Sequence, residues 1–282
     1  MNCRALPPES DFDNTPHAGI VAKWRRAVLR ETVSILAGKD PTHYQALAQV
    51  NLARWARAAK PSNPGVRVYP DDWGEVAMRL TKEQGKTFAV LNMANAYVAG
   101  GGYIEGMAAQ EENMFRRTDC HFSIQDAQLD GGGRIYRSCM TDHIEGLSGV
   151  CYLDVTNPRV CVRGPEVVGR MEGYEWLRDE DVFPFYELRA AARDYRNGDA
   201  FDLADARRRI CAQLDALVGA EVRHVVLGAS GCGAFKNPAA SIAKLYREEL
   251  SMRSHAFECV AFAIFHAGYG PSNYPVFRRE FE

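Results

Sequence analysis

Gly100-Gly101-Gly102 is followed after seven residues by Gln110-Glu111-Glu112 in this 282-residue chain. The fold of the chain can be inferred by working outward from this stretch. The segment before it, 87–93, is nearly all apolar and predicts a buried β-strand. The segment 107–115 is mostly Ala, Met, Gln and Glu, which favour a helix. We therefore expect a strand, a glycine turn and a helix in succession.

A strand that ends in bare glycines before a helix makes a site for an anion. Backbone N–H groups without side chains in front of them attract a phosphate, and so does the positive end of the helix dipole. Glu111 and Glu112 would lie in the first turns of that helix, which suggests a diphosphate bound beside an acid. The alternative is a glycine hinge before a helix with surface glutamates, and the spacing alone leaves both open.

The glycine pattern differs from the two standard nucleotide-binding loops. The dinucleotide fingerprint spaces its glycines as G-x-G-x-x-G, with an acidic residue about 20 positions later. Here the glycines are contiguous, and no Lys-Ser/Thr pair follows them as a triphosphate-binding loop requires.

A second strand, glycine loop and helix are expected nearer the C-terminus. Residues 223–229 read as a buried strand, and Asn237 is expected to cap a helix with Pro238 at its first position. Two such loops at the carboxyl edge of one sheet could hold a pyrophosphate from both sides. The second loop consists of Ser230, Gly231, Cys232, Gly233, Ala234 and Phe235.

The rest of the chain predicts an α/β protein with a helical N-terminal extension. Residues 65–282 alternate strand-like and helix-like segments, which implies a core with a mixed, largely parallel sheet flanked by helices. Residues 1–64 are expected to form an arm and a helical extension packed on that core. The expected helices are 18–37, 44–59, 185–196 and 202–217, and further strands are expected at 65–69, 149–153, 159–162 and 259–265.

Composition narrows the class of protein. The formal net charge of −2 gives no overall field for nucleic acid or an anionic membrane, so any phosphate recognition must be local. No apolar run approaches the roughly 18 residues of a membrane span, and the N-terminus lacks the apolar segment of a signal peptide. The eight cysteines contain no C-x-x-C pair, which favours a cytoplasmic or other reducing intracellular compartment.

The two loops resemble those of a known family. Asn95-Ala96, the glycine triplet and Gln110-Glu111-Glu112 are similar to the signature of microbial-type poly(ADP-ribose) glycohydrolases, which have a macrodomain fold. Residues 115–119 continue the likeness, and 231–237 resemble the family's second phosphate loop. Val98-Ala99 stands where the family commonly has Pro before the glycines, and 120–200 matches only loosely. These departures concern polymer specificity more than the ADP-ribose pocket.

The resemblance implies a macrodomain-like α/β fold and hydrolysis of the ribose–ribose bond of poly(ADP-ribose). Glu112 would protonate the leaving hydroxyl and then help to activate water, while Glu111 would accept hydrogen bonds from substrate hydroxyls. Repulsion between neighbouring carboxylates raises the pKa of one of them, whereas the helix dipole acts in the opposite sense.

The expected binding residues surround these acids. Asn95 would bind the distal ribose, and Phe235 would pack on that ribose or near the diphosphate. Cys232 is expected to be a packing residue rather than a nucleophile. Asp119 is expected to be a helix-end residue rather than a second acid. The diphosphate would be held by backbone N–H groups of Gly100, Gly101, Gly102 and the loop Gly231–Phe235, with Gln110, Ser230, Cys232, Gly233 and Ala234 completing the set.

Three other functions stay open at this level. The protein could remove a single ADP-ribose from a modified protein, or it could be a non-catalytic reader of ADP-ribose, or a structural α/β protein. A reader needs the glycine loops but has no use for paired acids. Neither a metal nor a cofactor is expected, since no histidine or acidic cluster has metal-ligand spacing. The expected partners are ADP-ribose or poly(ADP-ribose) on modified proteins, with no direct nucleic acid and no membrane.

Overall fold

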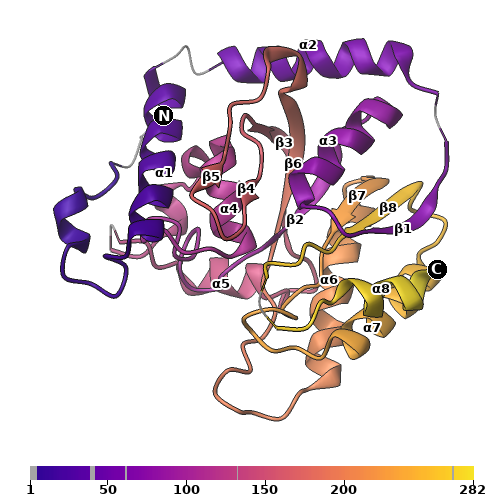
Figure 1. The fold of residues 1–282 in the computed structure, drawn as a ribbon. Helices are drawn as coiled ribbons and strands as arrows, with labels where there is room; N and C mark the ends of the chain where they lie inside the picture. Colours follow the sequence, from indigo (N-terminus) through magenta and orange to yellow (C-terminus); the bar gives the residue numbers. More distant parts are fainter. Residues whose placement is uncertain (1–4, 39–41, 61, 132, 269) are drawn as a thin grey trace.

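A six-stranded sheet forms the centre of the computed structural model, which describes residues 5–38, 42–60, 62–131, 133–268 and 270–282 (Figure 1). The strand order is β1–β8–β7–β2–β6–β3, and neighbours are parallel except for β3 and β6. The expected mixed, largely parallel sheet is confirmed. Its strands are β1 Gly65–Tyr69, β2 Phe88–Met93, β3 Tyr152–Cys161, β6 Phe183–Ala190, β7 His224–Leu227 and β8 Cys259–Ala263, and a separate hairpin pairs β4 Glu166–Val167 with β5 Glu172–Gly173.

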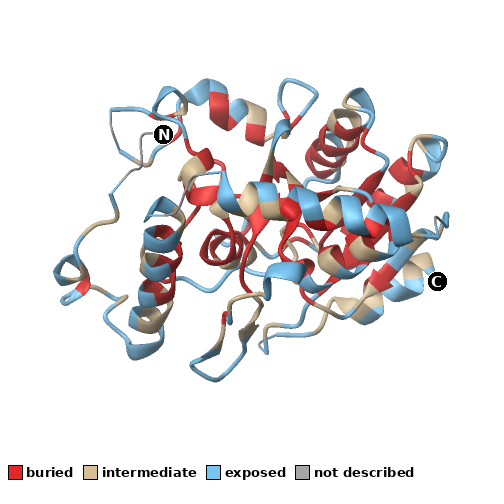
Figure 2. Cartoon of the chain, turned by 90° about the horizontal axis from the view of Figure 1, so that it is seen from above, coloured by how far each residue is buried: buried red, intermediate tan, exposed pale blue. Residues whose placement is uncertain are grey.

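Helices cover both faces of this sheet, which is why its central strands are mostly apolar on both sides. Along β2, Phe88 and Val90 join the core under α1, α3 and α4, whereas Ala89 and Leu91 join the core under α6, α7 and α8. Figure 2 shows the buried residues gathered where these layers meet. The helices are α1 Ile20–Gly38, α2 His43–Ala58, α3 Trp73–Gln84, α4 Gln110–Arg117, α5 Ser138–Ile144, α6 Leu203–Gly219, α7 Ala239–Met252 and α8 Tyr274–Phe281.

The N-terminal helices pack on the face of the sheet that carries α4. The Thr32 hydroxyl of α1 donates a hydrogen bond to the Arg116 carbonyl of α4 at 2.9 Å, and the Asn51 amide of α2 donates to the Val182 carbonyl at 2.9 Å. The two helices expected at 18–37 and 44–59 are confirmed to within two residues at each end. Residues 1–4 of the expected arm lie outside the described residues, and the division of the chain at residue 64 stays a prediction.

Local signals mark several helix ends. The Asp72 carboxylate accepts from the Gly74 N–H at the start of α3, and Gly85 ends that helix in the left-handed conformation. Asp202 caps α6 by accepting from the N–H groups of Ala204 and Asp205, so this expected cap is confirmed. Among the described helices, none is both long and apolar enough to cross a membrane.

Two expected elements are wrong in the middle of the chain. The helix expected at 185–196 is wrong: residues 183–190 are the strand β6, which is hydrogen-bonded between β2 and β3, and 191–196 are irregular. The alanine run at 190–192 favours a helix, but pairing on both edges and burial on both faces outweigh that propensity. The strands expected at 149–153 and 159–162 are one edge strand, β3, whose register shifts between Asp154 and Arg159.

An ion pair is buried inside the core on β6. Arg189 and Glu187, whose side chains are 0% and 1% exposed, face the layer under α4, and their charged groups lie 2.9 Å apart. The Arg189 guanidinium also donates to Tyr136 and Ser123, and the Asn92 amide donates to Glu187. Burying a charge is costly unless it is paired, so these contacts are needed to keep Glu187 and Arg189 inside the core.

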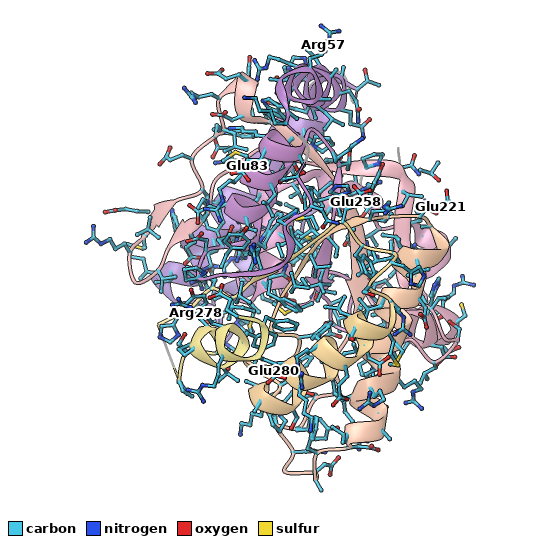
Figure 3. All side chains as sticks on the ribbon, turned by 90° about the vertical axis from the view of Figure 1, so that its right-hand side faces the viewer. Arg57, Glu83, Glu221, Glu258, Arg278 and Glu280 are labelled. Atoms are coloured by element: carbon cyan, nitrogen blue, oxygen red, sulfur yellow. The ribbon has the colours of Figure 1, made fainter. Side chains whose placement is uncertain are left out.

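We expect Arg189→Met to lower the free energy of unfolding by about 3–5 kcal/mol, because it leaves the Glu187 charge unpaired in the core. Urea unfolding measures the change, and Arg278→Met is the matched control. Arg278 pairs with Glu282 on the outside of α8 (Figure 3), so its replacement should change stability little. A small effect at Arg189 would show that Glu187 is not held as a charged group.

Candidate active site

The first glycine loop lies directly against two carboxylates. Gly100 and Gly101 have φ values of 74° and 55°, in the left-handed region that glycine adopts readily. A Cβ atom on Gly101 would lie 2.5 Å from Glu112 Oε1 and 2.8 Å from Glu111 Oε2. Any side chain at this position would therefore displace both glutamates, so both the backbone conformation and the close approach require glycine.

Each carboxylate is held through one oxygen and leaves the other without a partner. The Asn95 N–H donates to Glu111 Oε2 and the Gly102 N–H donates to Glu112 Oε1, both at 2.8 Å. The glutamates are only 3% and 7% exposed, and Glu111 Oε1 and Glu112 Oε2 are buried without a hydrogen-bond partner among the described residues. Buried polar atoms are normally paired, so these two oxygens are where a hydroxyl group or water would bind.

Burial controls the protonation of Glu111. The pKa of Glu111 is raised well above its ordinary value, first by burial and then by the neighbouring charge of Glu112, while the Asn95 N–H and Arg189 act in the opposite sense. The sequence left open which influence would prevail, and in the structure burial outweighs the opposing ones. Glu111 therefore retains its proton to a higher pH than an exposed glutamate does.

Gln110 and Asn95 both shape the site through the backbone. The Gln110 amide accepts from the Met93 N–H and donates to the Leu91 carbonyl, both at 2.9 Å, so it ties the start of α4 to the end of β2. Both polar atoms of Gln110, which we expected in substrate binding, are thus engaged inside the protein. The Asn95 side-chain oxygen accepts from the N–H groups of Tyr97 and Val98, which fixes the turn after β2.

The second glycine loop opens at the same edge of the sheet as the first. It follows β7, which lies parallel to β2, and Gly228 at its start contacts Met93 at the end of β2. The N–H groups of Ser230 and Cys232 donate to the carbonyls of Gly228 and Ala229, just before the loop. The remaining backbone N–H groups have no hydrogen-bond partner among the described residues, and they belong to Gly231, Gly233, Ala234 and Phe235.

The two loops therefore differ in what they offer to an anion. In the first loop the Gly101 N–H donates to the Val98 carbonyl at 2.9 Å, and the Gly102 N–H is taken by Glu112. Of the three glycines only Gly100 keeps an N–H group without a partner in the described chain. The first loop mainly holds the acids, whereas the second has the larger set of free donors.

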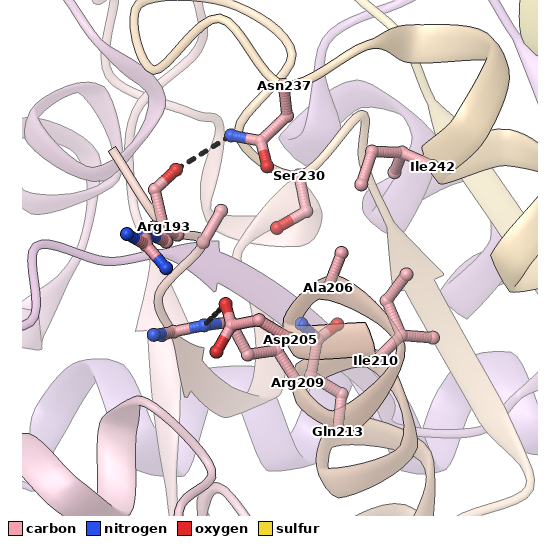
Figure 4. Close-up of a pocket in the computed structure, with 10 residues that line it drawn as sticks. Arg193, Asp205, Ala206, Arg209, Ile210, Gln213, Ser230, Asn237 and Ile242 are labelled. Carbon is pink, nitrogen blue, oxygen red and sulfur yellow. Dashed lines mark hydrogen bonds and ion pairs between the residues drawn. The ribbon is translucent and has the colours of Figure 1, made fainter. Parts of the chain in front are cut away.

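Asn237 supports the second loop from behind and does not cap a helix as expected. α7 begins at Ala239, with Pro238 at the cap position. The Asn237 amide instead donates to the carbonyls of Arg193 at 2.8 Å and Gly231 at 3.1 Å (Figure 4). From the sequence, this side chain was expected to cap the next helix. In the folded protein it bonds instead to the carbonyls of Arg193 and Gly231.

The space behind the loop is too small for a ligand. Ser230, which precedes the glycines of this loop, is buried. Ser230 and Asn237 line a cavity of about 10 Å³ against α6, which is about the size of one water molecule (Figure 4). A bound diphosphate would therefore have to lie on the open side of this loop.

Cys232 and Phe235 occupy the loop itself. Burial raises the pKa of the Cys232 thiol to about 12, which keeps the thiol protonated at neutral pH and agrees with a packing role for this residue. Phe235 is half-exposed, with the Arg196 guanidinium 5.3 Å from its ring centroid. Asp119 lies elsewhere, accepting from the Val160 N–H of β3 at 2.8 Å, which is a structural contact. Within the described residues, no group of three His, Cys, Asp or Glu side chains could hold a metal ion.

Sequence patterns did not identify Arg134, which reaches the first loop from 33 residues away. Its guanidinium donates to the Gly101 carbonyl at 3.0 Å and forms an ion pair with Glu105. The residue lies in a segment that runs antiparallel to the turn after β2, bridged at Val98 and Ile135. No spacing rule links an arginine in such a loop to the glycines, so only the tertiary structure reveals it.

The raised pKa of Glu111 predicts a specific pH dependence of stability. Since the unfolded chain loses this proton at a lower pH than the folded protein, stability falls as pH rises from the ordinary glutamate range through the folded pKa. Glu111→Gln keeps an oxygen for the Asn95 N–H but has no proton to lose, so it should not show this fall. Urea unfolding between about pH 4 and 9 measures it. Glu83 is exposed, so Glu83→Gln should show the same pH dependence of stability as the wild type. If Glu111→Gln also lost stability with rising pH as the wild type does, the raised pKa would not belong to Glu111.

A family model of known proteins matches part of this chain. Residues 29–134 match the family model of the microbial-type PARG catalytic domain, a segment that contains both glutamates and Arg134. A search of curated proteins found no match.

Solved structures extend the likeness over most of the chain. Poly(ADP-ribose) glycohydrolase from Thermomonospora curvata is 23% identical, with a TM-score of 0.61 over 91% of this chain and 99% of that one. The structure of the Thermomonospora curvata enzyme bound to the inhibitor ADP-HPD is 22% identical in sequence, with a TM-score of 0.58 over 91% of this chain and 99% of that one. A mutant of the glycohydrolase from Deinococcus radiodurans, in complex with ADP-ribose, is 25% identical, with a TM-score of 0.57 over 86% and 93%. The expected resemblance to the microbial-type poly(ADP-ribose) glycohydrolases is thus confirmed, in sequence over residues 29–134 and in fold over most of the chain.

Proposed function

We propose that this protein is a glycohydrolase that cleaves the ribose–ribose O-glycosidic bond at the free end of poly(ADP-ribose) and releases ADP-ribose. The observation that carries the proposal is the pair of buried glutamates at the start of α4. Each is anchored by a backbone N–H through one oxygen, and each keeps its second oxygen buried and unpartnered among the described residues. This arrangement presents two carboxyl oxygens to a sugar. Glutamates on the surface of a helix would be exposed and would not need these backbone anchors.

Glu112 acts as the acid and base in this proposal. Its free oxygen, Oε2, protonates the ribose oxygen that leaves as the bond to the anomeric carbon breaks. The carboxylate then takes a proton from the water that attacks the oxocarbenium-like carbon, which restores the acid. Glu111, with its unpartnered Oε1, receives the substrate hydroxyls and fixes the scissile bond.

The second loop binds the diphosphate in this proposal. It offers the N–H groups of Gly231, Gly233, Ala234 and Phe235, and it opens at the same sheet edge as the glutamates. The net charge of −2 provides no general attraction for phosphate, so directed backbone donors are the source of affinity. In this proposal Asn95 binds the distal ribose, and Phe235 packs on that ribose or near the diphosphate.

The same site could act on a single ADP-ribose attached to a protein, because the chemistry at the anomeric carbon is shared. The polymer is the first choice because the glutamates lie in the segment that matches the microbial-type catalytic domain. The substrate in the cell would be ADP-ribose chains on modified proteins. The described cysteines are free thiols, in keeping with the reducing compartment that the sequence predicts.

Replacing the proposed acid should separate hydrolysis from binding. We expect Glu112→Gln to lower the rate of ADP-ribose release from poly(ADP-ribose) at least about 100-fold, because glutamine accepts from Gly102 but cannot transfer the proton. Calorimetry should show ADP-ribose binding close to that of the wild type.

The control for this experiment is Glu221→Gln, an exposed glutamate that should leave the rate unchanged. Mono-ADP-ribosylated protein is assayed beside the polymer to decide which substrate is preferred. Normal hydrolysis by Glu112→Gln would show that the acid is assigned wrongly.

The shape of the second loop should control affinity. Gly231 has a φ of 71°, and a Cβ atom there would lie 2.4 Å from Asn237 Nδ2 and 2.5 Å from Ala192 Cβ. We expect Gly231→Ala to weaken ADP-ribose binding by roughly 10-fold or more, because relieving this strain displaces the free N–H groups. Gly219→Ala has open space around its added methyl group and is the control. Isothermal titration calorimetry measures both, and equal affinities would count against binding by this loop.

A further inference from the structure

One peptide unit connects Arg134 to Glu112. The Gly101 carbonyl accepts from Arg134 Nη1 at 3.0 Å, and the N–H of the same peptide, on Gly102, donates to Glu112 Oε1 at 2.8 Å. A cation at the carbonyl end polarises the peptide and makes its N–H a stronger donor, so the two bonds reinforce each other.

This peptide needs to be held from outside. Glycine stands on both sides of it, and glycine permits a wide range of backbone angles. Rotated by half a turn, the peptide would direct its carbonyl oxygen toward the Glu112 carboxylate, where the two oxygens would repel. The guanidinium favours the orientation in which the N–H faces the carboxylate.

Arg134 is itself fixed in place. Its second terminal nitrogen forms an ion pair with Glu105, which lies beyond the glycines, and its carbonyl accepts from the Ala99 N–H at 2.9 Å, just before them. Its side chain is 28% exposed, so the guanidinium is partly shielded from water. Arg134 therefore contacts residues on both sides of the glycine triplet, Ala99 and Glu105, as well as Gly101 in its centre. A lysine has one charged nitrogen and could not hold Glu105 and the Gly101 carbonyl equally well.

We propose that Arg134 is a positioning residue for the hydrolysis suggested above, acting on Glu112 through the Gly101–Gly102 peptide. By fixing Oε1 as the acceptor of the Gly102 N–H, it leaves Oε2 as the oxygen that carries the proton toward the substrate. The inference rests on the proposed function for its kinetic consequence, but the coupling of Arg134 to the Gly102 N–H is a property of the protein alone.

Arg134→Gln tests the proposal by kinetics. We expect kcat for ADP-ribose release to fall roughly 10-fold, the effect of losing one hydrogen bond to a charged group. KM and the affinity for ADP-ribose should change by less than about twofold, since no contact with the ligand is removed. Arg134→Lys should recover part of kcat. Arg137→Gln removes the same charge from an exposed position in the same segment and should leave kcat unchanged.

A second measurement does not depend on activity. In protein labelled with ¹⁵N-glycine, the amide proton of Gly102 should be shifted downfield and protected from exchange in the wild type. Arg134→Gln should reduce both, while Arg137→Gln should not. Arg134→Lys serves for both measurements if the glutamine variant does not fold.

The outcomes separate this inference from the proposed function. A wild-type protein that does not release ADP-ribose would refute the function, and the Gly102 signal would still decide the role of Arg134. Unchanged kcat together with an unchanged Gly102 amide in Arg134→Gln would overturn the inference. A large loss of ADP-ribose affinity with normal kcat would also overturn it, because Arg134 would then be a ligand of the diphosphate.

Discussion

The close contact between the Gly101 backbone and the carboxylates of Glu111 and Glu112 is the constraint on which the site depends. A methyl group in that position would overlap both side chains, so the loop has to be bare at this point. The same contact brings the Gly102 N–H to one glutamate, and the Asn95 N–H reaches the other. Strand, loop and helix are thereby fixed relative to each other at the place where two acids are buried.

Several ionisable side chains are buried on the face of the sheet that carries α4. Glu187 and Arg189 neutralise each other inside the core, whereas Glu111 lacks a comparable cation among the described residues and has a raised pKa. A carboxyl group without a paired cation in a low-dielectric site is unfavourable for stability, yet here it lies beside Glu112, the proposed acid, where it can accept hydrogen bonds from the substrate. Stability and chemistry therefore place opposite demands on neighbouring parts of the same layer.

The two loops, which are both rich in glycine, have different roles in the structure. The first uses its N–H groups largely to organise its own turn and to hold Glu112, and Arg134 supports it from outside. In the second loop most N–H groups have no hydrogen-bond partner among the described residues, and the Asn237 amide donates to the Gly231 carbonyl. Because β2 and β7 are adjacent and parallel, both loops open at one edge of the sheet, where acid chemistry and anion binding can meet.

The sequence by itself determined the strand, glycine loop and helix around 87–117, the cap at Asp202 and the largely parallel sheet. These features follow from local propensity and from apolar runs a few residues long. The tertiary structure decided that 183–190 is a strand, that Gln110 and Asn237 bond to backbone rather than to ligand or helix, and that Arg134 reaches Gly101. In each case the deciding partner lies far away in the sequence, so no local pattern could have named it.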